Sequence, residues 1–300
     1  MSLRQWAEQI LTGQHLTDKL AKAPPLLVDT RPGPPLSIII PPGRPACLPL
    51  SDPRPRAAFP GPGALADPRV RGEVLHYFAN HELLALELMA LVLLRFPDAP
   101  RAFRRGLADT MTEEQRHLSL YLSRMGELGV ELGEIPVNDF FWRCLSRVDS
   151  PAAFIAGMSL TFEQANLDYA LHYRDAFTSH GDVQTAALME EVCADEVGHV
   201  RHGLRWLRRW KPPGLDEWAA HAALLEHPLT LARARGRDFR RAPRREAGLP
   251  EAYIDRLEVY RHSKGRPPRI FYFNPGCEEE IVSGEDTLPA AALRLQRARE

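Results

Sequence analysis

Apolar residues recur at steps of three and four along four long stretches of the chain, with polar residues between them. This spacing is the period of an α-helix that buries one face, and proline is absent from the interior of each stretch. The pattern therefore predicts four long helices, at residues 69–95, 100–125, 151–179 and 183–209.

The connections between these helices differ in length. Those at 96–100 and 179–182 are short, whereas 126–150 is long and contains three glycines and a proline. Short connections produce antiparallel hairpins, and one long connection lets two hairpins pack with a crossover. We therefore expect an all-α fold, a ferritin-like four-helix bundle with a long crossover between the second and third helices. A further helix is expected within the crossover, at 138–148.

Prolines are concentrated near the N-terminus, where residues 1–68 contain 14 of the 27 in the chain. Proline interrupts helices and favours extended backbone, so residues 24–68 are expected to form an extended arm. Only residues 37–40 have the composition of a short strand. The compact part of the chain should then begin near Pro68. The predicted organisation has three parts: a Pro-rich arm at 1–68, a four-helix domain at 69–210 and a C-terminal extension at 211–300.

The composition, with 44% hydrophobic and 26% charged residues and a net charge of −1, is that of soluble globular domains and excludes a fibrous or wholly disordered chain. The four cysteines form no CxxC pair, which argues against a disulfide framework or a thiolate zinc site. The N-terminus lacks the apolar region of a signal peptide, and the longest apolar stretch, 83–94, is short for a membrane span. We expect a cytoplasmic protein without contact to membranes.

The helical pattern weakens after Trp210. Short helices are expected at 215–227 and 250–262, followed by a strand at 269–273 and a turn at 274–276. The C-terminal extension is therefore predicted to have mixed secondary structure.

A basic segment at 201–245 contains 12 Lys and Arg against 4 Asp and Glu. Such a segment is a candidate for binding nucleic acid, but a solvated helix face has the same composition. We favour the solvated face.

Two ExxH motifs carry the candidate chemistry, Glu114 with His117 and Glu196 with His199. On a helix, positions i and i+3 lie on the same face, so a carboxylate oxygen and an imidazole nitrogen can reach one metal ion. About one such motif is expected by chance at this composition, and a third, at residues 73–76, is present. The motif alone does not define a site.

The context of the two motifs is more specific, because a glutamate precedes each on the helix before it. Glu82 lies 32 residues before Glu114, and Glu163 lies 33 residues before Glu196. In an antiparallel hairpin with a short loop, this spacing brings the two positions to the same height. We therefore expect six side chains to converge in one layer of the bundle.

The negative charge expected in this layer favours the binding of cations. Glu82 and Glu196 fall on the apolar stripes of their helices, and a buried carboxylate is costly unless it is paired or binds a metal. Four carboxylates and two histidines without lysine or arginine on the same faces would nearly neutralise two divalent ions. Mixed oxygen and nitrogen ligands suit iron or manganese better than a structural zinc.

Glu87 is an alternative to Glu82 as the ligand from the first helix. The two lie about 140° apart around the helix, so both cannot face the centre. The symmetry of the hairpins favours Glu82, while Glu87 shares its face with His76 and Asn80, which form a rival set.

Five further residues have candidate roles beside the ligands. His202 is an extra ligand or a packing residue, and Tyr121 lies above the metals or in the core. Asp195 and Glu113 each precede a candidate ligand and either hold the second nitrogen of a histidine ligand or face solvent. Cys193 lines the pocket or packs as a small apolar residue, and we do not expect it to bind metal.

The arrangement of motifs resembles the ferritin-like carboxylate-bridged di-iron superfamily over about residues 70–210. Residues 194–199 are similar to the DExxH segment of its oxidase and oxygenase members. The run at 78–85, with the flanking arm and extension, is similar to a bacterial ferritin-like family, domain of unknown function 455. The resemblance implies that six residues hold two metal ions: Glu82, Glu114, His117, Glu163, Glu196 and His199.

The resemblance also implies roles for these ligands. Glu114 and Glu163, or their counterparts on the other helices, would bridge the metals, and His117 and His199 would each bind one of them through a ring nitrogen. The same six residues would then be the catalytic residues.

The expected function is that of a non-haem di-iron, or Fe/Mn, oxidase or oxygenase, with O2 as co-substrate and a small organic molecule as substrate. The alternatives are an iron-handling ferroxidase or peroxide-detoxifying protein, a tRNA-modifying hydroxylase that uses the basic segment, and a metal-free scaffold. Electrons would come from an external donor, because the sequence has no dinucleotide or haem motif. The family also suggests a homodimer.

Overall fold

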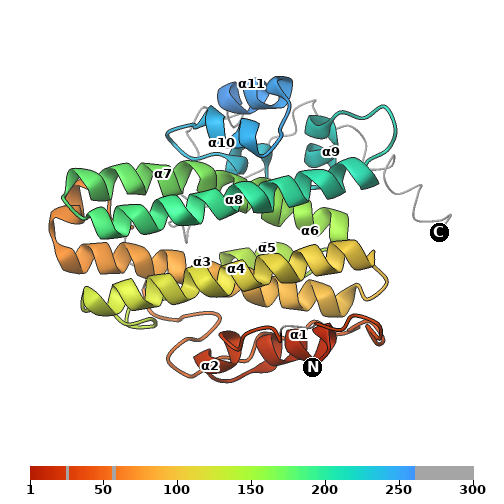
Figure 1. The fold of residues 1–300 in the computed structure, drawn as a ribbon, viewed down its shortest axis with the longest axis horizontal. Helices are drawn as coiled ribbons and strands as arrows, with labels where there is room; N and C mark the ends of the chain where they lie inside the picture. Colours follow the sequence, from red (N-terminus) through yellow and green to blue (C-terminus); the bar gives the residue numbers. More distant parts are fainter. Residues whose placement is uncertain (25–26, 56–58, 261–300) are drawn as a thin grey trace. The chain divides into compact units, whose positions relative to one another are not determined.

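The computed structural model describes residues 1–24, 27–55 and 59–260, and the regular secondary structure in them is helical (Figure 1). Within this described part, β-structure is limited to one isolated bridge between Ser2 and Val28. The all-α prediction is therefore confirmed, while the ferritin-like arrangement stays a prediction. The chain divides into two compact units, Met1–Pro151 with Tyr173–Val192, and Ala152–His172 with the residues from Cys193 onward.

Helix α3 (Pro68–Arg95) is the core helix of the first unit. It begins where the side chain of Asp67 accepts a hydrogen bond from the backbone N–H of Arg69, with Pro68 at its first position. Every residue from 74 to 94 is buried. Among the described helices it is the one long and apolar enough to cross a membrane, but its apolar window is buried inside the protein, which is typical of a soluble core helix.

Helix α4 (Arg101–Glu127) forms the first predicted hairpin with α3. The crossover that comes after α4 contains one helix, α5 (Phe140–Leu145), inside the range predicted from the sequence. Both helices lie in the first unit.

The closed end of the second hairpin belongs to the same unit. Helices α7 (Gln164–Ser179) and α8 (Val183–Trp210) are joined by a short turn, and α4 contacts them there. The Arg124 guanidinium donates to Asp182 at 2.9 Å, and the Phe78 and Tyr173 rings meet edge to face at 5.6 Å. Long helices are thus present at three of the four predicted places, 69–95, 100–125 and 183–209, and α7 occupies the C-terminal part of the fourth.

The N-terminus corrects one prediction, because folded structure begins well before Pro68. Helix α1 (Leu3–Thr12) has a capping box in which Ser2 and Gln5 exchange hydrogen bonds, and it packs on α3. Trp6 is fully buried, and its indole N–H donates to the Ala21 carbonyl at 2.9 Å. A short helix, α2 (Leu16–Lys19), comes next.

The described part of the Pro-rich arm has no strand, so the candidate strand at 37–40 is not formed. In the described residues between 24 and 67, the one regular element is a short 3-10 helix, η1 (Pro62–Ala66). Side chains attach the arm to the rest of the first unit: Arg54 donates to the Gly133 carbonyl at 3.0 Å, and the Tyr173 hydroxyl donates to the Pro60 carbonyl at 3.2 Å.

The second unit corrects the prediction of one continuous helix at 151–179. The chain forms α6 (Pro151–Gly157), then a π-helical segment, η2 (Met158–Glu163), and then α7. A π-helix accommodates an extra residue in the turn and often marks a functional site.

The C-terminal part of the second unit consists of short helices. They are α9 (Glu217–Leu224), the 3-10 helix η3 (Leu231–Ala234), α10 (Arg241–Glu246) and α11 (Glu251–Val259). α9 and α11 confirm the two helices expected there. The predicted strand and turn at 269–276 lie outside the described residues.

Candidate metal centre

Glu114 and His117 lie one turn apart on α4, as the ExxH spacing requires. Nδ1 of His117 is 3.6 Å from Oε2 of Glu114, and both side chains are buried. Glu82 is buried on α3, the other helix of the hairpin. The first hairpin therefore carries two carboxylates and one imidazole in its interior.

Glu196 and His199 form the equivalent pair on α8. Nδ1 of His199 lies 3.3 Å from Oε2 of Glu196, and both side chains are buried. Nδ2 of Asn166, on α7, donates to the other oxygen, Oε1 of Glu196, at 2.8 Å. One oxygen of this carboxylate is thus held by an amide, while the other faces the histidine.

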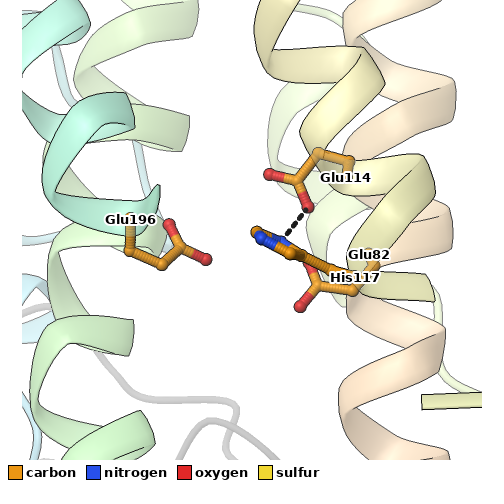
Figure 2. A group of neighbouring side chains, drawn as sticks. All are labelled: Glu82, Glu114, His117 and Glu196. Atoms are coloured by element: carbon orange, nitrogen blue, oxygen red, sulfur yellow. Dashed lines mark ion pairs between the residues drawn. The ribbon is translucent and has the colours of Figure 1, made fainter. Parts of the chain in front are cut away.

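The ligand atoms of the six residues fall into two groups, within each of which all of them lie within 4.8 Å of one another. Figure 2 shows the first group, in which the carboxylates and the ring point toward one another. Its members are Glu82, Glu114, His117 and Glu196, and those of the second group are Glu114, Glu163 and His199.

This grouping differs in one respect from the expected hairpin symmetry. Glu196 falls in the group of the first hairpin, while Glu163 and His199 fall in the other. Glu114 belongs to both groups, as a bridging carboxylate would. None of the six residues is more than 5% exposed.

The residues fit a pair of metal ions. Bonds of about 2.0–2.2 Å from carboxylate oxygen or imidazole nitrogen place the ligand atoms of one ion about 3 to 4.4 Å apart, within the spacing of both groups. Carboxylate and imidazole are ligands for divalent transition metals. Buried Glu and His groups that can hold a metal ion are therefore present.

Glu163 is the last residue of the π-helical segment, immediately before α7. An extra residue in a helix rotates the residues on its C-terminal side by about 100° relative to a regular α-helix. The direction of the Glu163 carboxylate therefore depends on where this extra residue is accommodated.

Glu87, the alternative to Glu82, has other partners. Its carboxylate accepts hydrogen bonds from Arg44, with Nη2 at 2.6 Å, and lies 3.2 Å from Nζ of Lys19. All three side chains are buried. Glu87 is thus neutralised by two cations from the N-terminal segment and belongs to neither ligand group.

The rival set on that face also has structural partners. Nε2 of His76 accepts a hydrogen bond from the backbone N–H of Gly133 at 2.9 Å, and Nδ2 of Asn80 donates to the Asn138 carbonyl at 3.1 Å. Burial and the nearby Arg54 lower the pKa of His76 to about 4. These residues hold the crossover against α3.

Three further candidates are placed mainly by packing. The Tyr121 ring stacks on Phe78, and Cys193 is buried with Sγ 3.9 Å from the Leu167 carbonyl. Burial, with charge from Arg205, lowers the pKa of His202 to about 4, and its ring lies near Trp206. None of the three belongs to the ligand groups found among the described residues.

Asp195 and Glu113 are half-buried beside Glu196 and Glu114. Neither belongs to the two groups found in the described part of the chain. Their role in holding a histidine ligand stays a prediction.

One protein family matches most of the chain that carries these ligand groups. The model of this family, described as "Protein of unknown function (DUF455)", matches residues 4–255. The chain belongs to this family. No curated protein and no solved structure matches it.

The DUF455 match extends beyond the four long helices. It includes nearly all of α1 and runs into α11, so the N-terminal helix and the C-terminal helices lie within the matched residues. The description of the DUF455 family names no activity.

Sequence reasoning missed three residues that pair with the candidate glutamates, one of them at the site and two at the alternative, Glu87. Lys19 and Arg44 neutralise Glu87, and Asn166 holds Glu196. Asn166 had a detectable signal, because it lies three residues after Glu163 and therefore on the same helix face. Lys19 and Arg44 gave no such signal, because they lie far from Glu87 in the sequence and outside any helical or hairpin spacing that would relate them to it.

Proposed function

We propose that this protein is a ferritin-like di-metal oxidase or oxygenase that uses two iron ions, or iron and manganese, to oxidise an organic substrate with O2. The observation that carries the proposal is the pair of buried ligand groups that share Glu114. Two ions that share a carboxylate can act together on one O2 molecule.

The type of ligand supports iron or manganese. Both groups contain carboxylate oxygens and imidazole nitrogens, and neither contains cysteine. A structural zinc site favours sulfur and nitrogen, whereas carboxylate-rich sites suit iron and manganese.

The order of helices supports the ferritin-like fold. Two hairpins, α3–α4 and α7–α8, are separated by a long crossover, and each supplies one glutamate and one ExxH pair. This is the pattern of ligands in ferritin-like di-iron carboxylate proteins.

Each residue has a defined task in this proposal. Glu114 would bridge the two ions, and His117 and His199 would each bind one of them. Asn166 fixes Oε1 of Glu196 and leaves Oε2 available to the metal. When bound, the iron supplies the electrons that reduce O2, and the buried surroundings limit the access of water.

The extent of the chain supports an enzyme over an iron-storage protein. The family match includes α1, the Pro-rich arm and the C-terminal helices, which are more than binding of two ions requires. These parts are available to shape a substrate pocket. Storage and detoxification remain as alternatives that reaction with O2 can distinguish.

The proposal is tested by reconstituting the protein with ferrous ion without oxygen and counting bound iron per chain. We expect about two iron ions in the wild type and a clear loss in Glu196→Gln. The matched control is Glu190→Gln, on the same helix, whose side chain is 68% exposed and should leave the iron content unchanged. Less than one iron per chain in the wild type, or equal iron in Glu196→Gln, would contradict the proposal.

Exposure of the loaded protein to O2 separates the two kinds of function. An oxygenase without its substrate should consume O2 in proportion to its bound iron and then stop. Continued oxidation of added ferrous ion with accumulation of mineral would instead identify an iron-handling protein.

A further inference from the structure

The π-helical segment that ends at Glu163 is connected to the C-terminal helices by a buried network. At its centre is His221 on α9, which is fully buried. Nε2 of His221 lies 3.0 Å from the carbonyl oxygen of Ala156, just before the segment, and 2.9 Å from Oγ1 of Thr161 within it. The Thr161 hydroxyl donates to the same Ala156 carbonyl at 2.8 Å, across five residues.

The partners of His221 determine its tautomer. A carbonyl oxygen only accepts hydrogen bonds, so Nε2 carries the hydrogen and donates to Ala156. Burial lowers the pKa of His221 to about 4, and the ring is therefore neutral near pH 7. Nδ1 then accepts from the Tyr253 hydroxyl of α11, at 2.7 Å.

The other end of the segment is held by the same group of helices. The Tyr253 hydroxyl lies 3.3 Å from Oε1 of Gln164, the residue after Glu163. Arg244 of α10 donates to the Gln164 carbonyl at 3.3 Å and pairs with Asp168 of α7 at 2.5 Å. The one hydrogen of the Tyr253 hydroxyl is donated to His221, so Tyr253 contacts Gln164 without a second donated hydrogen bond. Hydrogen bonds from α9 and α10 therefore fix the chain on both sides of Glu163, and Tyr253 of α11 orients His221.

Helix α8 is shaped to fit the segment at one point. A Cβ atom at Gly203 would lie 2.4 Å from Cβ of Ser159, which is closer than such atoms approach. Glycine therefore lets α8 come close to the widened turn.

We propose that His221 and Tyr253 are positioning residues that hold Met158–Glu163 in its π-helical form and thereby direct the Glu163 carboxylate toward the metal. The inference rests on the proposed function, because it takes Glu163 to be a ligand. It gives the C-terminal helices a task in the site, although none of their residues belongs to the ligand groups found in the described part of the chain.

The positioning role follows from the difference in free energy between the π-helical and α-helical forms of Met158–Glu163. A π-helical turn is less stable than the α-helical turn that the same residues can form, and it persists when its surroundings fix it. Loss of the His221 bond to Ala156, or of the Tyr253 hydroxyl that orients His221, allows the extra residue to move along the helix. The Glu163 carboxylate would then turn away from its ligand position.

The test uses His221→Phe and Tyr253→Phe, with His221→Gln as the conservative variant that retains one donor and one acceptor. The control is Leu257→Ala, which removes a fully buried side chain of α11 that has no hydrogen-bonding group to contribute to the network. Binding of Mn(II) is followed by electron paramagnetic resonance, and hydrogen exchange of amides 158–164 is measured on the metal-free protein.

We expect His221→Phe and Tyr253→Phe to weaken one of two Mn(II) sites by about 10- to 100-fold and to speed exchange in this segment. His221→Gln should restore much of the affinity, and Leu257→Ala should lower stability while leaving both Mn(II) sites intact. Unchanged binding and exchange in His221→Phe and Tyr253→Phe would overturn the inference. So would an equal loss of affinity in Leu257→Ala, because it would assign the effect to general stability.

The metal proposal and this inference fail in different ways. If the wild type binds no Mn(II) or iron, the proposed function is wrong. If the wild type binds two ions and Glu163→Ala loses one, while His221→Phe keeps both, only the positioning role is wrong.

Discussion

Glu82 and Glu87 lie five residues apart on α3, and both are buried, yet their surroundings differ completely. Glu82 lies in a group of metal-binding type, whereas Glu87 is neutralised by Lys19 and Arg44. Helix α3 therefore contains two buried carboxylates in different environments. Glu82 lies among groups suited to bind a cation, and Glu87 is neutralised by buried cationic side chains.

The two glutamates should respond differently to the same substitution. Glu87→Gln leaves Lys19 and Arg44 buried without their anion, and we expect it to destabilise the fold by about 3–5 kcal/mol while metal content is retained. Glu82→Gln should reduce metal content with a smaller change in the stability of the metal-free protein. Denaturant unfolding and metal analysis of both variants make the comparison, and the reverse result would assign the ligand to Glu87.

His76 makes stability depend on pH. Its pKa is lowered to about 4, so between the ordinary value near 6.5 and pH 4 the unfolded chain takes up a proton that the folded protein does not. Stability is then constant above about pH 6.5, falls toward pH 4 and levels off below it. The loss should reach about 3 kcal/mol at pH 4 for this residue, because the two pKa values differ by about 2.5 and each pKa unit corresponds to about 1.4 kcal/mol. Protonation also removes the acceptor of the Gly133 N–H.

Thermal unfolding between pH 7 and pH 4 tests this dependence in the metal-free protein. His76→Gln keeps a hydrogen-bond acceptor without a titrating group, and it should make the fall in stability between pH 6.5 and pH 4 less steep. Buried His221, whose pKa is also lowered to about 4, contributes to the pH dependence of stability in the same range. Its contribution should persist in His76→Gln. Identical slopes in the wild type and His76→Gln would refute the assignment.

At the scale of elements, α8 contains two glycines with different surroundings. Gly203 faces Ser159 of the π-helical segment, whereas a Cβ at Gly198 would meet nothing within 4 Å. Both lie in the same helix, so they share the intrinsic cost of glycine in a helix. They differ only in what the added methyl group would contact.

We therefore expect opposite effects from the same substitution. Gly203→Ala should destabilise by about 1–3 kcal/mol through overpacking against the segment, and Gly198→Ala should stabilise by up to about 1 kcal/mol through helix propensity. Denaturant unfolding of the metal-free variants measures both. Stabilisation by Gly203→Ala would mean that α8 is free to move away from Ser159.

The elements also show what the sequence could predict. The period of apolar residues locates the four long helices, and the two ExxH pairs with their preceding glutamates select the six residues that the structure groups. The π-helical segment could not be foreseen, because Met158–Glu163 has an ordinary helical composition and its form depends on side chains from distant helices. Helix α1 had a signal in the spacing of Leu3, Trp6 and Ile10, but the prolines after it obscured that signal.

At the scale of the whole molecule, charge is balanced within the second unit. Much of the basic segment at 201–245 is paired, for example Arg241 with three acidic side chains of α11 and Arg208 with Glu217. Arg244 pairs with Asp168 in the interior. The composition of the segment alone thus overstates the charge available to a nucleic acid.

We accordingly expect only weak, nonspecific binding of RNA. The dissociation constant for a bulk tRNA mixture should lie at about 10⁻⁴ M or weaker near physiological salt, the weak end of nonspecific binding. Fluorescence anisotropy at two salt concentrations measures it. A tight complex that survives at 200 mM salt would instead favour a tRNA-modifying enzyme.

The ion cluster of Glu87 has a consequence for the order of assembly. Until the N-terminal segment brings Lys19 and Arg44 to α3, Glu87 is an unneutralised carboxylate on the helix that also carries Glu82. A cation that arrives early then has a competing place to bind. If the proposed function is right, docking of the N-terminal segment before metal uptake would remove this competitor and direct the incoming ion to the group that contains Glu82.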